Sequence, residues 1–399
     1  MNKSLLLTAA AMVCASTSFA QSSELSRNNE VSEQSLFESV TKIEKKTDKF
    51  NLYLNMQGDF DLDWVGSDFQ EGKFQMRQLR IEALGNINDW LSYRYRQRLN
   101  KGDDTRGYRD NLLNSIDIAG FGMKFGKWQF FLGKQCAAYG GMEFDLNPIE
   151  VYQYSDMIDN MSNFMSGVDV GYNFTPNQQL RVQMLNSHNV SSRDMYGDYE
   201  KAKMPFVYTI NWNGNFNDFY RTRWSASFMN ETKGEHMWYF ALGNSFNFSD
   251  KFQAYFDWLY SIEGVDRKGI ITRMVGNEGP NGQHYNASKV DYMSFILHLN
   301  YRFHPAWNIF AKGMYETAGV YKTNTNRATG AELASGNYST TYSYIGGIEY
   351  YPFKDRNLHF FAAYVGQHHN YASKAKAFGM ENYSTNRFSL GFIWQMPVF

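Results

Sequence analysis

The 399-residue sequence has little of what usually stabilises or anchors a protein of this size. It contains two cysteines and seven prolines. Only Cys136 remains after removal of the leader described below, so the exported chain cannot form an internal disulfide. Beyond the N-terminus no apolar run approaches the roughly 20 residues of a membrane helix, which excludes a helical membrane protein. The net charge of −1 gives no general attraction to nucleic acid, so any charge selectivity has to be local.

The sequence is rich instead in alternating apolar and polar residues. Residues 51–57 read NLYLNMQ, and residues 387–394 repeat the pattern as RFSLGFIW. Side chains on a strand point to opposite faces with period two, so each such segment has one apolar and one polar face. Aromatic residues make up 17% of the chain, which favours strands and argues against disorder. The pattern indicates a sheet that separates two environments.

The N-terminus predicts export. Lys3 precedes an apolar run at residues 5–13, and Ser18-Phe19-Ala20 supplies the small residues of a signal-peptidase site, so we expect a signal peptide at 1–20. Cys14 follows Val13 rather than a small residue, which disfavours lipid attachment. Residues 21–48 form a polar periplasmic segment, either a short helix capped by Ser35 or a loosely docked leader.

Residues 49–399 are predicted to form one all-β domain, a transmembrane antiparallel β-barrel of about sixteen strands. An even strand number and lengths near ten residues suit a closed, tilted bacterial barrel. Closure also removes unpaired strand edges. The expected strands are 49–64, 74–87, 91–100, 112–125, 127–134, 164–174, 178–187, 205–213, 221–231, 236–247, 251–262, 289–303, 306–317, 339–351, 357–367 and 386–399.

The connections alternate in length, which predicts orientation. Residues 88–90, 176–177, 249–250 and 304–305 form short polar turns, whereas 100–111, 263–287, 321–337 and 367–385 are long. Short periplasmic turns and long external loops are typical of the outer membrane of a Gram-negative bacterium.

The clearest charge pattern lies on the second and third strands. Arg94, Arg96 and Arg98 alternate with the apolar face of the third strand, about 6.8 Å apart at the usual rise. Each arginine would cost roughly 2 to 4 kcal/mol at the lipid midplane, so this face should line the lumen. Pairing around the 88–90 turn places Arg80 opposite Arg98 and Glu82 opposite Arg96.

The same reasoning applied to the first hairpin sets Asp59 opposite Arg80. We therefore expect Arg80, Arg94, Arg96, Arg98, Glu82 and Asp59 to line the pore, with a modest positive surplus. A register slip of one residue would reverse the faces.

Residues 74–87 (FQMRQLRIEALGNI) with 90–96 (WLSYRYR), and the later run 124–134 (KFGKWQFFLGK), resemble hairpins of the phosphate-selective porin O and P family. The resemblance is in pattern more than in identity and is strongest in the first third of the mature chain. It implies a sixteen-stranded, usually trimeric diffusion barrel, a third extracellular loop that narrows the pore, and passage of anions or phosphate.

The composition of the loop expected to narrow the pore does not favour passage of anions or phosphate. Residues 136–163 carry five acidic side chains and no lysine or arginine: Glu143, Asp145, Glu150, Asp156 and Asp159. In a narrow, poorly screened site they would repel a phosphate dianion. Alternatively they pair with basic wall residues and hold the loop in place. The porin interpretation therefore extends to small hydrophilic solutes, and phosphate specificity stays open.

Two other classes of function remain to be separated from a porin. A surface-exposed binding or adhesion barrel would work through long loops such as 263–287 and conduct little. A barrel enzyme would need a serine with a positioned histidine. Ser294 and His298 share a strand face, which is either the outward side with Val290, Tyr292 and Ile296 or a locally mixed face. No cofactor or metal motif is recognised, so we predict no enzyme and no cofactor.

The expected partners follow from the barrel: small hydrophilic solutes or anions, outer-membrane lipid, two further copies of the chain, and the barrel-assembly machinery. The last would read the aromatic Phe399, although Pro397 interrupts the closing strand.

Overall fold

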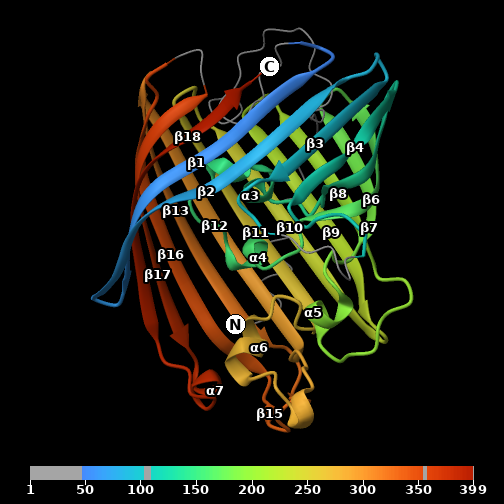
Figure 1. The fold of residues 1–399 in the computed structure, drawn as a ribbon, viewed down its shortest axis with the longest axis vertical. Helices are drawn as coiled ribbons and strands as arrows, with labels where there is room; N and C mark the ends of the chain where they lie inside the picture. Colours follow the sequence, from blue (N-terminus) through green and yellow to red (C-terminus); the bar gives the residue numbers. More distant parts are fainter. Residues whose placement is uncertain (1–46, 103–108, 354–356, 399) are drawn as a thin grey trace.

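The computed structural model describes residues 47–102, 109–353 and 357–398, and these form a closed antiparallel barrel of sixteen strands (Figure 1). The expected signal peptide (1–20) and nearly all of the polar segment (21–48) lie outside the described residues, as does Phe399. The wall consists of β1 (Asn51–Val65), β2 (Asp68–Asn86), β3 (Leu91–Arg98), β4 (Ile116–Phe125), β5 (Trp128–Cys136), β6 (Phe164–Thr175), β7 (Gln178–Asn186), β8 (Phe206–Phe216), β9 (Tyr220–Thr232), β10 (Glu235–Asn247), β11 (Phe252–Val265), β12 (Ser288–His304), β13 (Trp307–Val320), β16 (Gly336–Tyr350), β17 (Leu358–Tyr371) and β18 (Tyr383–Pro397).

The barrel closes where its first and last strands pair. β1 and β18 run antiparallel from the Tyr53–Pro397 pair to the Val65–Thr385 pair. Pro397 is the last residue of its strand, where a missing N–H costs little. All sixteen expected strands are thus present, and no helix in the described residues is long and apolar enough to cross a membrane.

Short helices and one small hairpin are not part of the barrel sheet. They are α3 (Met142–Asp145), η1 (Pro148–Glu150), α4 (Asp156–Asp159), α5 (Ser192–Tyr196), α6 (Ile270–Val275), η2 (Pro280–Gly282), α7 (Ser373–Lys376) and the pair β14 (Asn324–Thr325) and β15 (Glu332–Leu333). Figure 1 places α5, α6, α7 and β15 at the end of the barrel opposite the C-terminus, whereas α3 and α4 lie inside the wall. The long loops therefore gather at one end, as the connection lengths predict.

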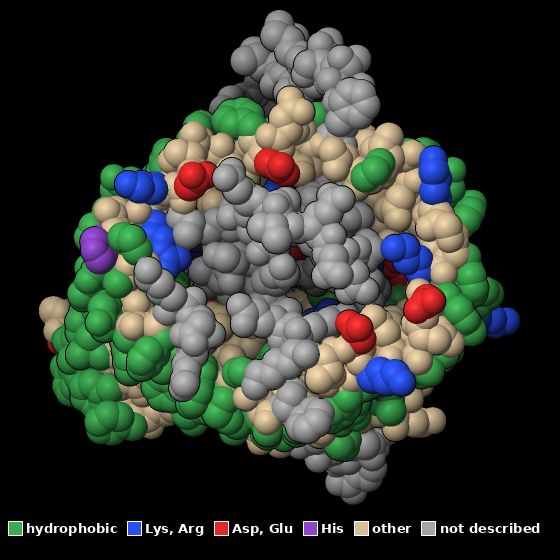
Figure 2. Space-filling model, turned by 90° about the horizontal axis from the view of Figure 1, so that it is seen from above, with side chains coloured by type: hydrophobic (Ala, Val, Ile, Leu, Met, Phe, Trp, Pro, Cys, Tyr) green, Lys and Arg blue, Asp and Glu red, His purple; other side chains and the backbone are tan. Residues whose placement is uncertain are grey.

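The two faces of the wall differ as the alternation requires. On β8, Ile210 is 56% exposed and Tyr208 is also exposed, whereas Thr209 and Asn211 between and beside them are buried. Seen along the barrel from the end with the short turns, hydrophobic side chains gather along much of the outer circumference (Figure 2). An apolar outer belt around a polar inner face suits lipid outside and water inside.

Aromatic residues cluster where strands meet the short turns. The rings of Phe216, Tyr220, Phe246, Phe248 and Phe252 form a continuous series of contacts with centroids 5.0–6.0 Å apart. Such belts are typical of the membrane–water interface, because an aromatic ring tolerates both environments.

Two expectations about side-chain placement are wrong. Asp59 pairs with Gln75 rather than Arg80, which lies opposite Asn55. The hairpin turn falls at Gly66, whose φ of 60° suits a tight hairpin, and a bulge next to Gln57 shifts the register again.

The second error is the outward alternative for Ser294 and His298 on β12; the locally mixed face is the one found, because Val290, Tyr292 and Ile296 are buried on the same side as Ser294. Ser294 and His298 face the interior, since they pair with Glu316 on β13 and Tyr255 on β11, both buried, while Leu297 is 47% exposed to the outside. Apolar residues on the inner face of β12 pack against loops rather than lipid, so apolarity alone misassigned the face.

The interior holds a hydrophobic core on one side. Residues of the loop that follows β5, among them Met157 and Ile158, pack with inward residues of β8 to β13 such as Met229 and Leu259, and with Ile271 of α6. The loop is thus held by burial of apolar surface as well as by polar contacts. The clustered arginines of the interior lie on other strands, β2 and β3.

Candidate functional site: an arginine wall facing the inward loop

Four arginines predicted to line the lumen lie on the inner face of β2 and β3. Arg80 pairs with Arg98, Glu82 with Arg96, and Leu84 with Arg94, which is the register expected from the sequence. Adjacent cationic side chains repel, so this cluster requires nearby carboxylates.

One buried carboxylate that the sequence analysis missed holds three of these arginines. Asp117 on β4 lies 2.9 Å from Nε of Arg80, 3.4 Å from Nε of Arg96 and 3.1 Å from Nε of Arg98. The register shifts by one residue between Arg96 and Gln97, so Asp117 falls in the bulge between Ile116 and Ile118. Its only signal in the sequence is an acid between two isoleucines.

Glu82 and Asp59 each hold an arginine, but not the ones that face them in the expected registers. Glu82 accepts a 2.8 Å hydrogen bond from Nε of Arg94, its diagonal neighbour, and a 3.1 Å bond from Asn55. Asp59 lies 2.7 Å from Nε of Arg77, and Arg77 also pairs with Asp61. Arg77 is the extra residue of the β2 bulge, which turns it inward.

The wall formed by β18 and β1 to β4 carries a positive surplus. Six arginines (Arg77, Arg80, Arg94, Arg96, Arg98 and Arg387) lie with five carboxylates (Asp59, Asp61, Asp63, Glu82 and Asp117), which leaves one positive charge among them. Arg94 and Arg98 keep 26% of their side-chain surface exposed, so water and solutes reach them. We refer to these eleven residues as the arginine wall.

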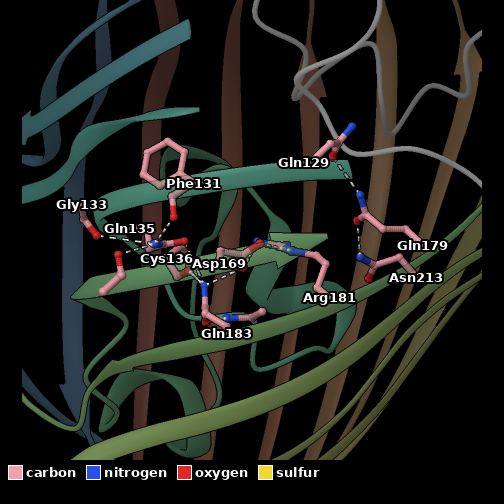
Figure 3. Close-up of polar contacts among 12 residues, drawn as sticks. Gln129, Phe131, Gly133, Gln135, Cys136, Asp169, Gln179, Arg181, Gln183 and Asn213 are labelled. Atoms are coloured by element: carbon pink, nitrogen blue, oxygen red, sulfur yellow. Dashed lines mark hydrogen bonds and ion pairs between the residues drawn. The ribbon is translucent and has the colours of Figure 1, made fainter. Parts of the chain in front are cut away.

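The adjoining strands β5 to β8 are polar but balanced. Arg181 pairs with Asp169 at 2.8 Å, and Gln183 donates to the same carboxylate at 3.0 Å. Figure 3 shows this cluster beside a second one in which Gln179 bonds Gln129 and Asn213. Uncharged amides and a neutralised ion pair add hydrogen-bonding surface without a further field.

The loop after β5, residues 137–163, bends into the barrel and is here called the inward loop. Its α3 end is fixed to β11, because the amides of Met142 and Glu143 donate to Asp257 at 2.7 and 2.8 Å. The Glu143 carboxylate forms an ion pair with Lys312 on β13, and both side chains are buried.

The tip of the inward loop reaches the far wall. The Tyr152 ring stacks on Phe310 with centroids 4.7 Å apart and planes 5° from parallel, and its hydroxyl donates to Glu349 at 2.7 Å. Arg387 of the arginine wall donates to the Tyr152 carbonyl at 2.6 Å. The loop therefore spans the interior from β5 to β18.

Some of the five acidic residues of the loop pair with basic wall residues and hold the loop in place, and others do not. Glu143 pairs with Lys312 and Asp145 with Arg223, as the anchoring alternative expects. Burial, reinforced by the nearby Glu349, raises the pKa of Glu150 well above its ordinary value.

Asp156 and Asp159 lie together on α4, and no ion pair is found for either among the described residues. Burial, followed by repulsion from Asp159, raises the pKa of Asp156 to about 6. The inward loop thus exposes less negative charge than its composition suggests.

The residues considered for other chemistry do not assemble into a catalytic group. The Ser294 hydroxyl donates to Glu316 at 2.6 Å, while the His298 ring packs against Tyr255. Across the described parts of the chain, no three His, Cys, Asp or Glu side chains are grouped to hold a metal ion.

A closed sixteen-stranded barrel with an apolar belt outside, a charged wall inside and a loop across its interior defines an outer-membrane porin, a passive diffusion channel of Gram-negative bacteria. The match to the phosphate-selective porin O and P family covers residues 50–396, and the chain belongs to that family. A search of curated proteins finds no match.

Solved structures of outer-membrane proteins share the fold at low sequence identity. The outer membrane channel DcaP of Acinetobacter baumannii has a TM-score of 0.55 at 14% identity, over 89% of this chain and 99% of that chain. The anion-selective porin of Comamonas acidovorans has 0.52 at 7%, over 87% and 99%. The trimer form of OmpT from Vibrio cholerae has 0.51 at 12%, over 87% and 100%.

Proposed function

We propose that this porin passes small hydrophilic solutes with a preference for anions, phosphate among them, and that no bond is made or broken in the process. The observation that carries this proposal is the arginine wall, whose six guanidiniums exceed its five carboxylates by one charge. A fixed positive surplus lowers the energy of an anion in the bore and raises that of a cation.

The inward loop sets the size limit in this proposal. Glu143 and Asp145 form ion pairs with Lys312 and Arg223 of the wall. Their negative charges therefore oppose anion passage less than unpaired carboxylates would. Arg94 and Arg98 keep a quarter of their surface exposed and supply the donors that a passing phosphate would meet. The family name and the anion-selective relative agree with this preference.

We further propose that the chain works as a homotrimer in contact with outer-membrane lipid, inserted by the barrel-assembly machinery. A trimeric relative supports the assembly. Many outward residues, such as Phe74 at 85% exposed, offer apolar surface to lipid or to a second copy.

Planar-bilayer recording with a potassium chloride gradient tests the proposal. We expect a reversal potential with the sign that chloride permeation gives. Added phosphate should either reduce the chloride current or carry current itself, and a neutral sugar should be partly excluded from the pore by its size. A cation-selective reversal potential would refute the anion preference. Absence of any conductance from a heat-modifiable, folded barrel would favour the adhesion alternative, and hydrolysis of lipid or peptide would favour the enzyme.

A further inference from the structure

A small cavity lies where α4 of the inward loop meets the inner face of the wall. It has a volume of about 10 Å³, which is room for roughly one water molecule or one ion. Its lining combines apolar side chains and Lys268 with several oxygen-bearing side chains, among them Asp156, Glu316, Ser294, Ser339 and Thr341.

Glu316 of β13 is the most buried of these acids, with 3% of its surface exposed. Its Oε1 accepts hydrogen bonds from the Ser294 hydroxyl at 2.6 Å and from the Asp156 amide at 2.8 Å. Its Oε2 is buried and has no hydrogen-bond partner in the described parts of the chain. A buried carboxylate oxygen left without a partner is costly, so this atom points to a missing ligand.

The basic groups nearby are engaged elsewhere. Lys268 lines the cavity, but its Nζ forms an ion pair with Glu263 and a 3.0 Å hydrogen bond to Ser261. Arg273 donates to Asn160, and its charge is felt by Asp156. Lys312 forms an ion pair with Glu143 and so does not neutralise Glu316. Asp156 and Glu316 are therefore two neighbouring carboxylates whose negative charges repel each other.

We propose that this cavity binds a hard divalent cation of the calcium type between Glu316 and Asp156. Calcium takes anionic carboxylate oxygens together with neutral oxygen ligands and tolerates irregular geometry, whereas magnesium demands a near-ideal octahedron. Two carboxylates match the charge of one divalent ion, and the Ser294, Ser339 and Thr341 hydroxyls supply further oxygens. The bound ion ties α4 to β13 and so fixes the inward loop against the wall.

Terbium luminescence tests the site directly. Tb³⁺ occupies oxygen-rich calcium sites and emits when a nearby tyrosine is excited, and Tyr292 lines the cavity. The full chain, refolded in detergent without lipopolysaccharide, should show tyrosine-sensitised emission that Ca²⁺ displaces. Glu316→Gln keeps the acceptor for Ser294 but removes the charge, and should weaken Tb³⁺ binding at least about tenfold. Glu332→Gln changes an exposed acid on β15 and should bind as the wild type does.

A second variant and a second readout separate the site from a folding defect. Asp156→Asn removes the other carboxylate and should weaken Tb³⁺ binding in the same way, in barrels shown to be folded by heat-modifiable migration. Ca²⁺ should raise the unfolding temperature of the wild type relative to EDTA, and not that of either variant. Absence of sensitised emission in the wild type, or equal binding by the wild type and folded Glu316→Gln, would overturn the proposal. These measurements do not depend on conductance, so they stand apart from the test of ion preference.

Discussion

Nε of Arg80 lies 2.9 Å from the Asp117 carboxylate, and both side chains are almost completely buried. Arg96 and Arg98 approach the same carboxylate. One acid from β4 thus holds together a group of guanidiniums from β2 and β3. Removing a single partner from a buried charge group leaves the others uncompensated, which typically costs about 3–5 kcal/mol.

Asp117→Asn should therefore lower the unfolding temperature of the barrel while increasing its chloride preference, because one neutralising charge is lost from the arginine wall. Both effects can be measured, the first by gel migration after heating and the second by reversal potential. Asp250→Asn, in an exposed periplasmic turn, serves as the matched control. A variant with unchanged stability would mean that Asp117 does not hold the arginines.

Neutralising Arg94, Arg96 and Arg98 together to glutamine should lower the chloride-to-potassium permeability ratio. Three positive charges leave the wall, whose net charge then changes from positive to negative. The readout is the reversal potential in asymmetric salt, and Arg193→Gln on α5 is the control because its side chain is 66% exposed at the external end. Unchanged reversal potentials would show that these arginines are outside the conduction path.

Lys312→Met should loosen the inward loop and raise single-channel conductance, because the buried Glu143 carboxylate loses its ion-pair partner. Current noise in bilayer recordings should increase with it. The double variant Glu143→Gln with Lys312→Met restores neutrality and should recover part of the wild-type behaviour. Lys251→Met, exposed in a periplasmic turn, is the control, and identical conductance in all four proteins would contradict the anchoring role.

Ile210→Arg should destabilise the barrel by about 2–4 kcal/mol if the residue lies near the bilayer midplane, because it places a charge against lipid. Ile210 is 56% exposed on the outer face of β8. The free energy of unfolding from lipid vesicles measures the effect, with Ile210→Leu as the control. Equal stability of the two variants would argue that this face does not contact lipid.

Acid should open the loop between β7 and β8. Burial, then the charges of Arg267 and Arg109, lowers the pKa of His188 to about 3. A histidine whose pKa is lower in the folded state contributes stability that is present above about pH 6.5 and is lost as pH falls toward 3. Proteolysis of residues 187–205 should therefore accelerate between pH 6.5 and pH 4.

His188→Asn, which stays neutral, isolates the contribution of this histidine. The variant should lose the part of the pH dependence that arises from His188, while carboxylates elsewhere titrate alike in both proteins. The same acceleration in the variant and the wild type would assign the effect to other groups.

The β2–β3 register could be predicted because a short turn and a strict alternation determine it together. Glu82 does lie opposite Arg96, and Arg80 opposite Arg98. The register of Asp59 could not be predicted, because a bulge adds one residue to a strand without any change in the alternation that precedes it. Asp117 was missed for the same reason, since it occupies the bulge of β4.

The pattern of oily and polar residues by itself determined the number of strands, their antiparallel closure, the membrane they cross and the arginines that face inward, because a charge on the wrong face would meet lipid. Only the tertiary structure decided which acid pairs with which arginine. It also decided which strands carry apolar side chains on their inner face. Ser294 faces the interior because the inner side of β12 packs against α6 and against the inward loop, which is more than a hundred residues away in the sequence. A contact at that separation leaves no local periodicity.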